Sequence, residues 1–230
     1  KRVYLLADMW ELISQDWNIR SIIIEDGKMH MRAIKPGVTN FQLVKPSATT
    51  DTTSTHFLLN LSAAKLKNVQ YIYEDIPSSV LVDLQIHDAE VAGNFTESKF
   101  YIETDAVLFS NHIEIKGIDY AQAKDMALEG NIRILPETNA YSLEIPAIQI
   151  QDNNFSVAGS FEVPEEKTVF DLDVQGHDLS VSGFLKLFPD TVLSYTQDYQ
   201  VEGELKFGVK IKGDLSKTQS PRVDINYQLD

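Results

Sequence analysis

The sequence predicts an all-β protein with one long, mostly antiparallel meander sheet. Apolar and polar residues alternate along about a dozen segments, turn residues separate these segments, and only two short stretches have helical spacing. Successive side chains of an extended chain point to opposite faces, so each segment should present one apolar and one polar face. The short connections favour antiparallel neighbours, because a parallel crossover needs about a dozen residues or more.

The first predicted element is a hairpin that turns at Asp26-Gly27, with alternating apolar residues from Ile22 to Met31 on either side of the turn. Further strands are predicted over residues 80–87, 100–103, 126–134, 141–145, 154–162, 170–174, 201–215 and 223–229. Turn-forming residues separate the segments at 35–37, 46–54, 76–78, 136–139, 164–167 and 216–221.

One long alternation is VEGELKFGVKIKGDL, residues 201–215. As a single strand it would run roughly 50 Å, at about 3.3 Å per residue. Its apolar residues share one face. We expect the charged residues of the opposite face to be exposed, namely Glu202, Glu204, Lys206, Lys210 and Lys212.

Two short helices are predicted, over residues 8–13 and 178–188. The first begins at Asp8, a residue type that favours the N-cap, and Pro189 ends the second. Each follows a strand-like segment, so these helices either cap the open ends of a sheet or simply connect strands. The candidate cap presents the apolar residues Leu179, Phe184, Leu187 and Phe188.

The composition fits a single domain over residues 1–230, long enough for a substantial core. The net charge of −14 argues against nucleic acid as a partner, and the absence of cysteine excludes disulfides and thiolate zinc sites. No apolar run approaches the roughly 20 residues of a membrane helix. Because the sequence begins at Lys1, we expect it to be a segment of a longer chain.

No catalytic, metal or cofactor site is predicted. The five histidines lack the i, i+4 spacing of a helical metal site, and there is no Gly-rich phosphate loop or nucleophile elbow. Asp171 and Asp173 share one strand face, where they either bind a cation weakly or, as we favour, keep that face hydrated. Tyr71 and Tyr73 share a face with Val69, a pattern more typical of a core than of a carbohydrate platform.

An apolar sheet face must be covered, and two arrangements would achieve this. A second sheet would give a β-sandwich, a structural or protein-interaction module whose edges pair with other strands. Alternatively, one long, strongly twisted and curved sheet would form a trough or U-shaped groove around a hydrophobic ligand. A lipid chain suits such a groove because it requires no hydrogen bonds and gains about 0.8 kcal/mol per buried methylene.

Several segments match, in order, the pattern of one known family. The strand pair NIRSIIIEDGKMHM (residues 18–31) precedes GVTNF (37–41), and the run FLLNLSAAKLKNVQYIYED (57–75) reads as a hairpin. NAYSL (139–143), residues 159–190 and VEGELKFGVKIKGDLSKTQSPRVDINYQL (201–229) read as closing strands. Together these segments resemble the AsmA-like family of Gram-negative envelope proteins, over nearly the whole chain.

The resemblance implies a periplasmic protein, tethered to the inner membrane by an anchor outside this segment, that acts in outer-membrane biogenesis. It implies a non-enzymatic groove for phospholipid or another acyl lipid, without catalytic residues, metal or cofactor, and with edge-strand pairing to neighbouring segments as a further interaction. The candidate groove-lining residues are Val80, Val82, Leu84, Ile86, Phe100, Ile102, Phe170, Leu172, Val174, Val201, Leu205, Phe207, Val209 and Ile211.

Overall fold

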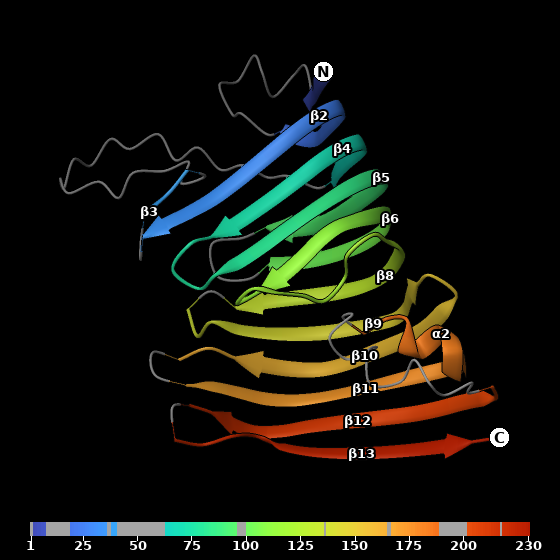
Figure 1. Cartoon of the computed structure of the whole chain (residues 1–230). Helices are drawn as coiled ribbons and strands as arrows, with labels where there is room; N and C mark the ends of the chain where they lie inside the picture. The colour runs from blue at the N-terminus through green and yellow to red at the C-terminus, as the bar shows by residue number, and fades with distance from the viewer. Residues whose placement is uncertain are drawn as a thin grey trace.

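The structure is a computed structural model that describes residues 2–7, 19–35, 38–40, 63–95, 100–135, 137–164, 167–188, 202–216 and 218–230. The strands are β1 (Arg2–Ala7), β2 (Ile19–Lys35), β3 (Val38–Thr39), β4 (Ala63–Asp75), β5 (Val80–Phe95), β6 (Phe100–Ile115), β7 (Ile118–Asp119), β8 (Lys124–Leu135), β9 (Ala140–Ile150), β10 (Asn153–Glu162), β11 (Thr168–Ser180), β12 (Glu204–Leu215) and β13 (Arg222–Leu229). The one helix among the described residues is α2 (Val181–Leu185) (Figure 1).

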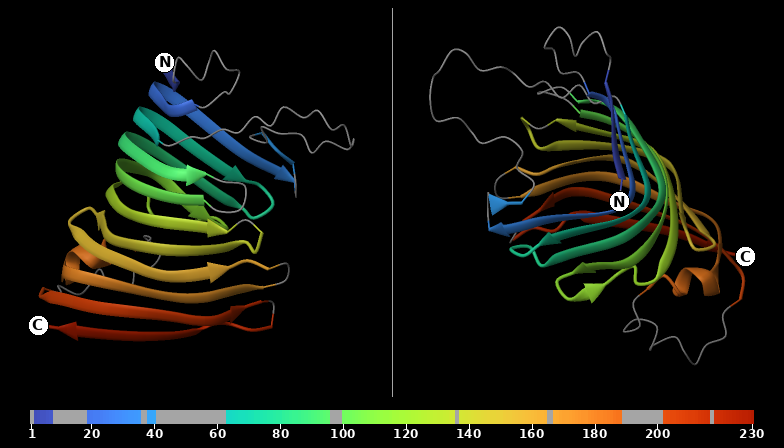
Figure 2. Two further views of the ribbon diagram at one scale, coloured as in Figure 1. Left: turned by 180° about the vertical axis from the view of Figure 1, so that it is seen from behind. Right: turned by 90° about the horizontal axis from the view of Figure 1, so that it is seen from above.

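All thirteen strands belong to one open sheet, in the order β1-β2-β4-β5-β6-β8-β9-β10-β11-β12-β13. The short strands β3 and β7 pair with β2 and β6. Neighbours are antiparallel except β2 and β4, which run parallel, so the all-β, mostly antiparallel prediction is confirmed with one exception. The described strands include no second sheet that would complete a sandwich. Figures 1 and 2 show that the sheet twists along its length and that its longer strands bend.

The predicted hairpin at Asp26-Gly27 is wrong, because β2 continues through this point as a strand of 17 residues. Asp26 adopts a φ of 52°, and Asn68 of the neighbouring strand β4 adopts the same value. The two residues lie opposite each other, and Asn68 Nδ2 donates a hydrogen bond to Asp26 Oδ1 at 2.8 Å. Asn and Asp tolerate positive φ better than most residues. The Asp-Gly pair that predicts a turn from the sequence therefore forms a kink inside the strand.

The same kink continues into the third strand. The pairing of Lys67 with Asp88 and of Val69 with Ile86 leaves His87 opposite Asn68, and β5 has a bulge at this level relative to β6. Each of the three strands therefore has one residue that interrupts the regular alternation at this level. These residues, Asp26, Asn68 and His87, are polar and exposed, and we call them the bulge line. A bulge bends its strand and increases the local twist.

Three further predictions differ from the structure. The described part of the run over residues 57–75 contains no hairpin, because residues 63–75 form the single strand β4. The strand predicted over 201–215 begins at Glu204, and β2, β5 and β6 are all longer than this strand, β12. The helix predicted over 178–188 is reduced to α2, because β11 continues to Ser180, whose Oγ accepts the N-cap hydrogen bond from Gly183 N at 3.0 Å. Residues 8–13 lie outside the described part.

The sheet has one apolar and one polar face. The apolar face carries two buried clusters, which we name by their surroundings. The bulge cluster, on β4, β5 and β6, consists of Val69, Ile86, Ala89 and Ala106. The helix cluster, on β10, β11, α2 and β12, consists of Phe155, Leu179, Val181 and Leu205.

Candidate functional site

A row of aligned apolar residues crosses the whole sheet, perpendicular to the strands. Each residue of the row pairs in register with the next, from edge strand β1 to edge strand β13. The row consists of Val3, Ile24, Leu66, Ala89, Ala106, Leu128, Ile148, Phe155, Gly176, Phe207 and Tyr227. Eleven strands therefore present one continuous apolar band, which we call the central row.

Two of the shorter rows on the same face run parallel to the central row. The first contains Ile102, Ile132, Leu143, Gly159, Leu172, Ile211 and Val223. The second contains Ile134, Tyr141, Phe161 and Phe170, and its rings are in contact. Tyr141 stacks on Phe161 with ring centroids 4.5 Å apart, and Phe161 lies 6.3 Å from Phe170. Aliphatic and aromatic side chains thus occupy this face from one strand to the next.

The apolar side chains become more exposed at the β13 edge of the sheet. Val223, Ile225, Tyr227 and Leu229 lie on the apolar face and are between 52% and 71% exposed. Their partners on β12 are buried or half-buried. A β13 residue has a neighbouring strand on one side only, so its side chain lacks half of the lateral contacts that β12 side chains have.

The structure places every described residue of the predicted groove lining on the apolar face. Val80, Val82, Leu84 and Ile86 lie on β5, Ile102 on β6, Phe170, Leu172 and Val174 on β11, and Leu205, Phe207, Val209 and Ile211 on β12. The backbone of Phe100 pairs with Ile134 at the start of β6, but its side chain and the whole of Val201 lie outside the described part. The predicted lining omits the apolar-face residues of β1, β2, β4, β8, β9, β10 and β13.

The predicted cap residues lie over the β10–β12 part of the apolar face. Leu179 is a strand residue of β11, fully buried, and Phe184 and Leu187 pack against the helix cluster. The Phe184 ring lies 4.9 Å from that of Phe207 in the central row. Phe188 contacts Phe184 edge-on at 5.2 Å and remains 39% exposed. The segment from Leu179 to Phe188 therefore covers the helix cluster at one margin of the sheet.

A few polar side chains interrupt the apolar face. Thr104, Ser110 and Asn153 are buried there, and Lys124 is half-buried at the start of β8. The Lys124 ammonium donates a hydrogen bond to the carbonyl oxygen of Lys186, in the turn after α2, at 2.7 Å. Tyr71 is half-buried on the same face, aligned in register through Leu84 with Ser110 and Lys124. Burial is the main cause that raises the pKa of its phenol, and the neighbouring Tyr73 adds to the effect. This agrees with the core interpretation of Tyr71.

The opposite face is covered by cross-strand ion pairs. Lys212 Nζ lies 2.8 Å from Asp171 Oδ2, and Lys210 Nζ lies 3.3 Å from Asp173 Oδ2. Both β11 carboxylates are therefore paired with lysines of β12. The prediction that the charged residues of 202–212 are exposed is confirmed for all five. Exposed pairs of this kind contribute little stability, but they keep the face hydrated.

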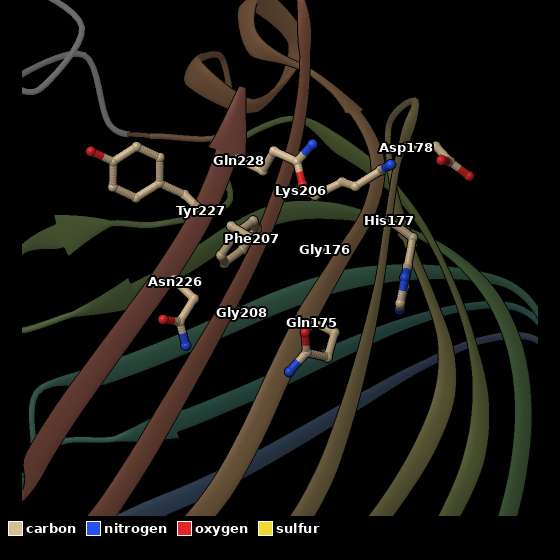
Figure 3. A pocket seen from close by; sticks show the side chains of 10 residues that line it. All are labelled: Gln175, Gly176, His177, Asp178, Lys206, Phe207, Gly208, Asn226, Tyr227 and Gln228. Atoms are coloured by element: carbon tan, nitrogen blue, oxygen red, sulfur yellow. The ribbon is translucent and has the colours of Figure 1, made fainter. Parts of the chain in front are cut away.

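Pockets on the polar face are small and have mixed linings. Figure 3 shows one of about 470 Å³ on β11, β12 and β13, where Gly208 lacks a side chain and Gln175, His177 and Lys206 surround the gap. Among the described residues, no three or more His, Asp or Glu side chains are arranged to hold a metal ion. His112 Nδ1 lies 2.6 Å from Asp119 Oδ2, at the base of the β6–β7 turn.

No protein-family model, curated protein or solved structure matches the chain. Within the described part of the chain, no helix has the length and apolar character needed to span a membrane.

Proposed function

We propose that this chain is a non-enzymatic lipid-binding or lipid-transfer segment, and that its apolar face lines a trough. The observation that carries this proposal is the central row, an apolar band that continues across eleven strands. An acyl chain is the ligand that such a surface favours, because it gains about 0.8 kcal/mol per buried methylene and leaves no hydrogen bond unmade.

The dimensions of the row suit transfer as well as binding. With strands about 4.8 Å apart, ten steps between eleven strands give a band about 48 Å long. An acyl chain spans half of the roughly 30 Å hydrocarbon core of a bilayer, about 15 Å. The band is therefore about three acyl chains long. A lipid could occupy successive positions along it without leaving the apolar surface.

The bends of the strands support the trough. The bulge line kinks β2, β4 and β5 at one level, and Val69, directly after Asn68, is fully buried. In this proposal the bends turn the apolar face inward, and the segment from Leu179 to Phe188 caps the groove at one margin. The AsmA-like resemblance adds the setting: a periplasmic groove, tethered to the inner membrane, that acts on phospholipid or another acyl lipid in outer-membrane biogenesis.

The proposal is tested by lipid binding with two matched variants on neighbouring residues of β8. Leu128→Asp places a carboxylate in the central row, whereas Ala127→Asp places the same group on the polar face. We expect saturable uptake of a fluorescent fatty acid by the wild type and by Ala127→Asp, and at least tenfold weaker uptake by Leu128→Asp. Melting curves verify that both variants fold. Absence of saturable uptake by the wild type, together with absence of copurified lipid, would refute the proposal.

A second candidate function is strand addition at β13, favoured by the exposure of its four apolar side chains. A further antiparallel strand would pair with this edge and cover Ile225 and Tyr227, as β12 covers the other side. Ile225→Lys is the test, because a charge on an edge strand discourages pairing. We expect size-exclusion chromatography with light scattering to show association of the wild type and less association of the variant. A wild type that stays monomeric at high concentration, and binds no strand peptide, would argue against it.

A further inference from the structure

Lys124 places a cation on the apolar face. It alternates with Met126 and Leu128, which pair with Ile150 and Ile148 on the same side of the sheet. Its side chain is half-buried, and its Nζ reaches the carbonyl oxygen of Lys186 at 2.7 Å. An ammonium group has three donors, and this contact uses one of them. The remaining two donors are available for a ligand.

Ser110 lies directly beside Lys124 and carries an unpaired hydroxyl. The two residues are register partners on β6 and β8. Ser110 is 0% exposed, and its Oγ has no hydrogen-bond partner among the described residues. Leaving a buried polar group unpaired costs about 1–3 kcal/mol, so such a group calls for an explanation. An oxygen-rich group held at Lys124 would supply the missing partner.

We propose that Lys124 and Ser110 form a headgroup site that binds the carboxylate or phosphate of an amphiphile. This inference rests on the proposed lipid function and specifies that the lipid carries an anionic headgroup. The ammonium and the hydroxyl donate to anionic oxygens, and the acyl chain runs from there over Met126 and Leu128 to the central row. A neutral amphiphile of the same length makes the same apolar contacts and lacks the headgroup contacts.

The alternative role of Lys124 is structural. Lysine side chains commonly bind the last carbonyls of a helix, and the contact with Lys186 O follows α2 directly. In that case Lys124 would contribute to the stability of the α2 region and would not distinguish between headgroups. The measurement must therefore compare ligands that differ only in the head, because a stability change is common to both roles.

The experiment is displacement of a fluorescent fatty acid by three competitors with the same chain length: a fatty acid, a lysophosphatidic acid and a fatty alcohol. We expect at least one of the anionic competitors to bind the wild type tenfold or more tightly than the alcohol. Lys124→Gln should abolish this preference and leave the alcohol affinity unchanged, and Lys124→Arg should restore it. Ser110→Ala should reduce it several-fold. Lys206→Gln, on the polar face, is the control and should have no effect.

The two anionic arms separate the sources of the headgroup. Preference for the fatty acid identifies a carboxylate, and preference for lysophosphatidic acid identifies a phosphate. Equal affinity of the wild type for acid, phosphate and alcohol would overturn the headgroup site while leaving the lipid groove intact. A preference that survives in Lys124→Gln would also overturn it. Failure of the fluorescent probe itself to bind the wild type would refute the proposed function and this inference together.

Discussion

The bulge cluster and the helix cluster bury the same face of one sheet by different means. The bulge cluster has partly buried neighbours from the sheet itself, namely Ile24, Met29, Leu66, Tyr71 and Leu108. The helix cluster has neighbours from the strands, among them Ile150 and Phe207, and also from α2 and the turn after it, namely Phe184, Leu185 and Leu187. Among the described residues, the bulge cluster therefore packs with residues of the sheet alone, whereas the helix cluster also packs with residues outside the strands.

The largest expected effect is in the helix cluster. Leu179 is fully buried between the strands and α2, so Leu179→Ala should lower the free energy of unfolding by about 2–5 kcal/mol through lost burial and a residual cavity. Leu215→Ala is the control, because that side chain is 45% exposed at the end of β12. Urea denaturation measures both. Equal losses for the two variants would contradict the covering role of α2.

The next effect is in the bulge cluster. Val69→Ala removes two methyl groups from a fully buried position and should cost about 2 kcal/mol, from roughly 0.8 kcal/mol per carbon plus a cavity term. Val107→Ala, on the polar face of β6, should change stability by less than about 0.5 kcal/mol. A loss at Val69 no larger than at Val107 would mean that the bent sheet does not form a real core there.

The sequence predicts the two faces because alternation is local. Every described residue of the predicted lining is on the apolar face, and even Lys124 could have been placed there, since it lies two residues before Met126. The central row could not be predicted, because it depends on the register of eleven strands and each bulge shifts that register.

Local signals also misled where a strand continues through a positive φ. Asp26-Gly27 has the composition of a hairpin turn, but Asp26 uses its φ of 52° within β2. Asp178 has a φ of 51° in the bulge that lets β11 extend to Ser180, so Leu179 is a strand residue where helical spacing was expected. In both cases an Asp that tolerates this conformation marks a bulge, and only the pairing with neighbouring strands distinguishes a bulge from a turn or cap.

A third variant tests whether the bulge line shapes the bulge cluster. Asn68→Val places a β-branched side chain at a φ of 52° and removes the hydrogen bonds to Asp26 and Gln85, so we expect a loss of about 1–2 kcal/mol. Asn68→Gly keeps the conformation accessible and should lose less. Hydrogen exchange should show the loss of protection on β2, β4 and β5 and not around α2. Equal destabilisation by valine and glycine would assign the effect to the hydrogen bonds alone.

The smallest effect concerns Asp119, which lies outside both clusters. Burial alone would raise the pKa of this carboxyl, but hydrogen bonds from His112 and from the backbone N–H groups of Ile113 and Ala121 outweigh it and lower the pKa below its ordinary value near 3.8. A group with a lowered folded-state pKa stabilises the protein above its unfolded pKa, and this contribution disappears as the pH falls through the folded pKa. Wild type should therefore lose stability relative to Asp119→Asn as the pH is lowered from about 5 to 3. The melting temperature difference between the two proteins measures this loss. Because Asp119 and its hydrogen-bond partners belong to neither cluster, the difference should be the same in a Val69→Ala background. A pH-independent difference would show that the carboxylate charge does not stabilise the turn.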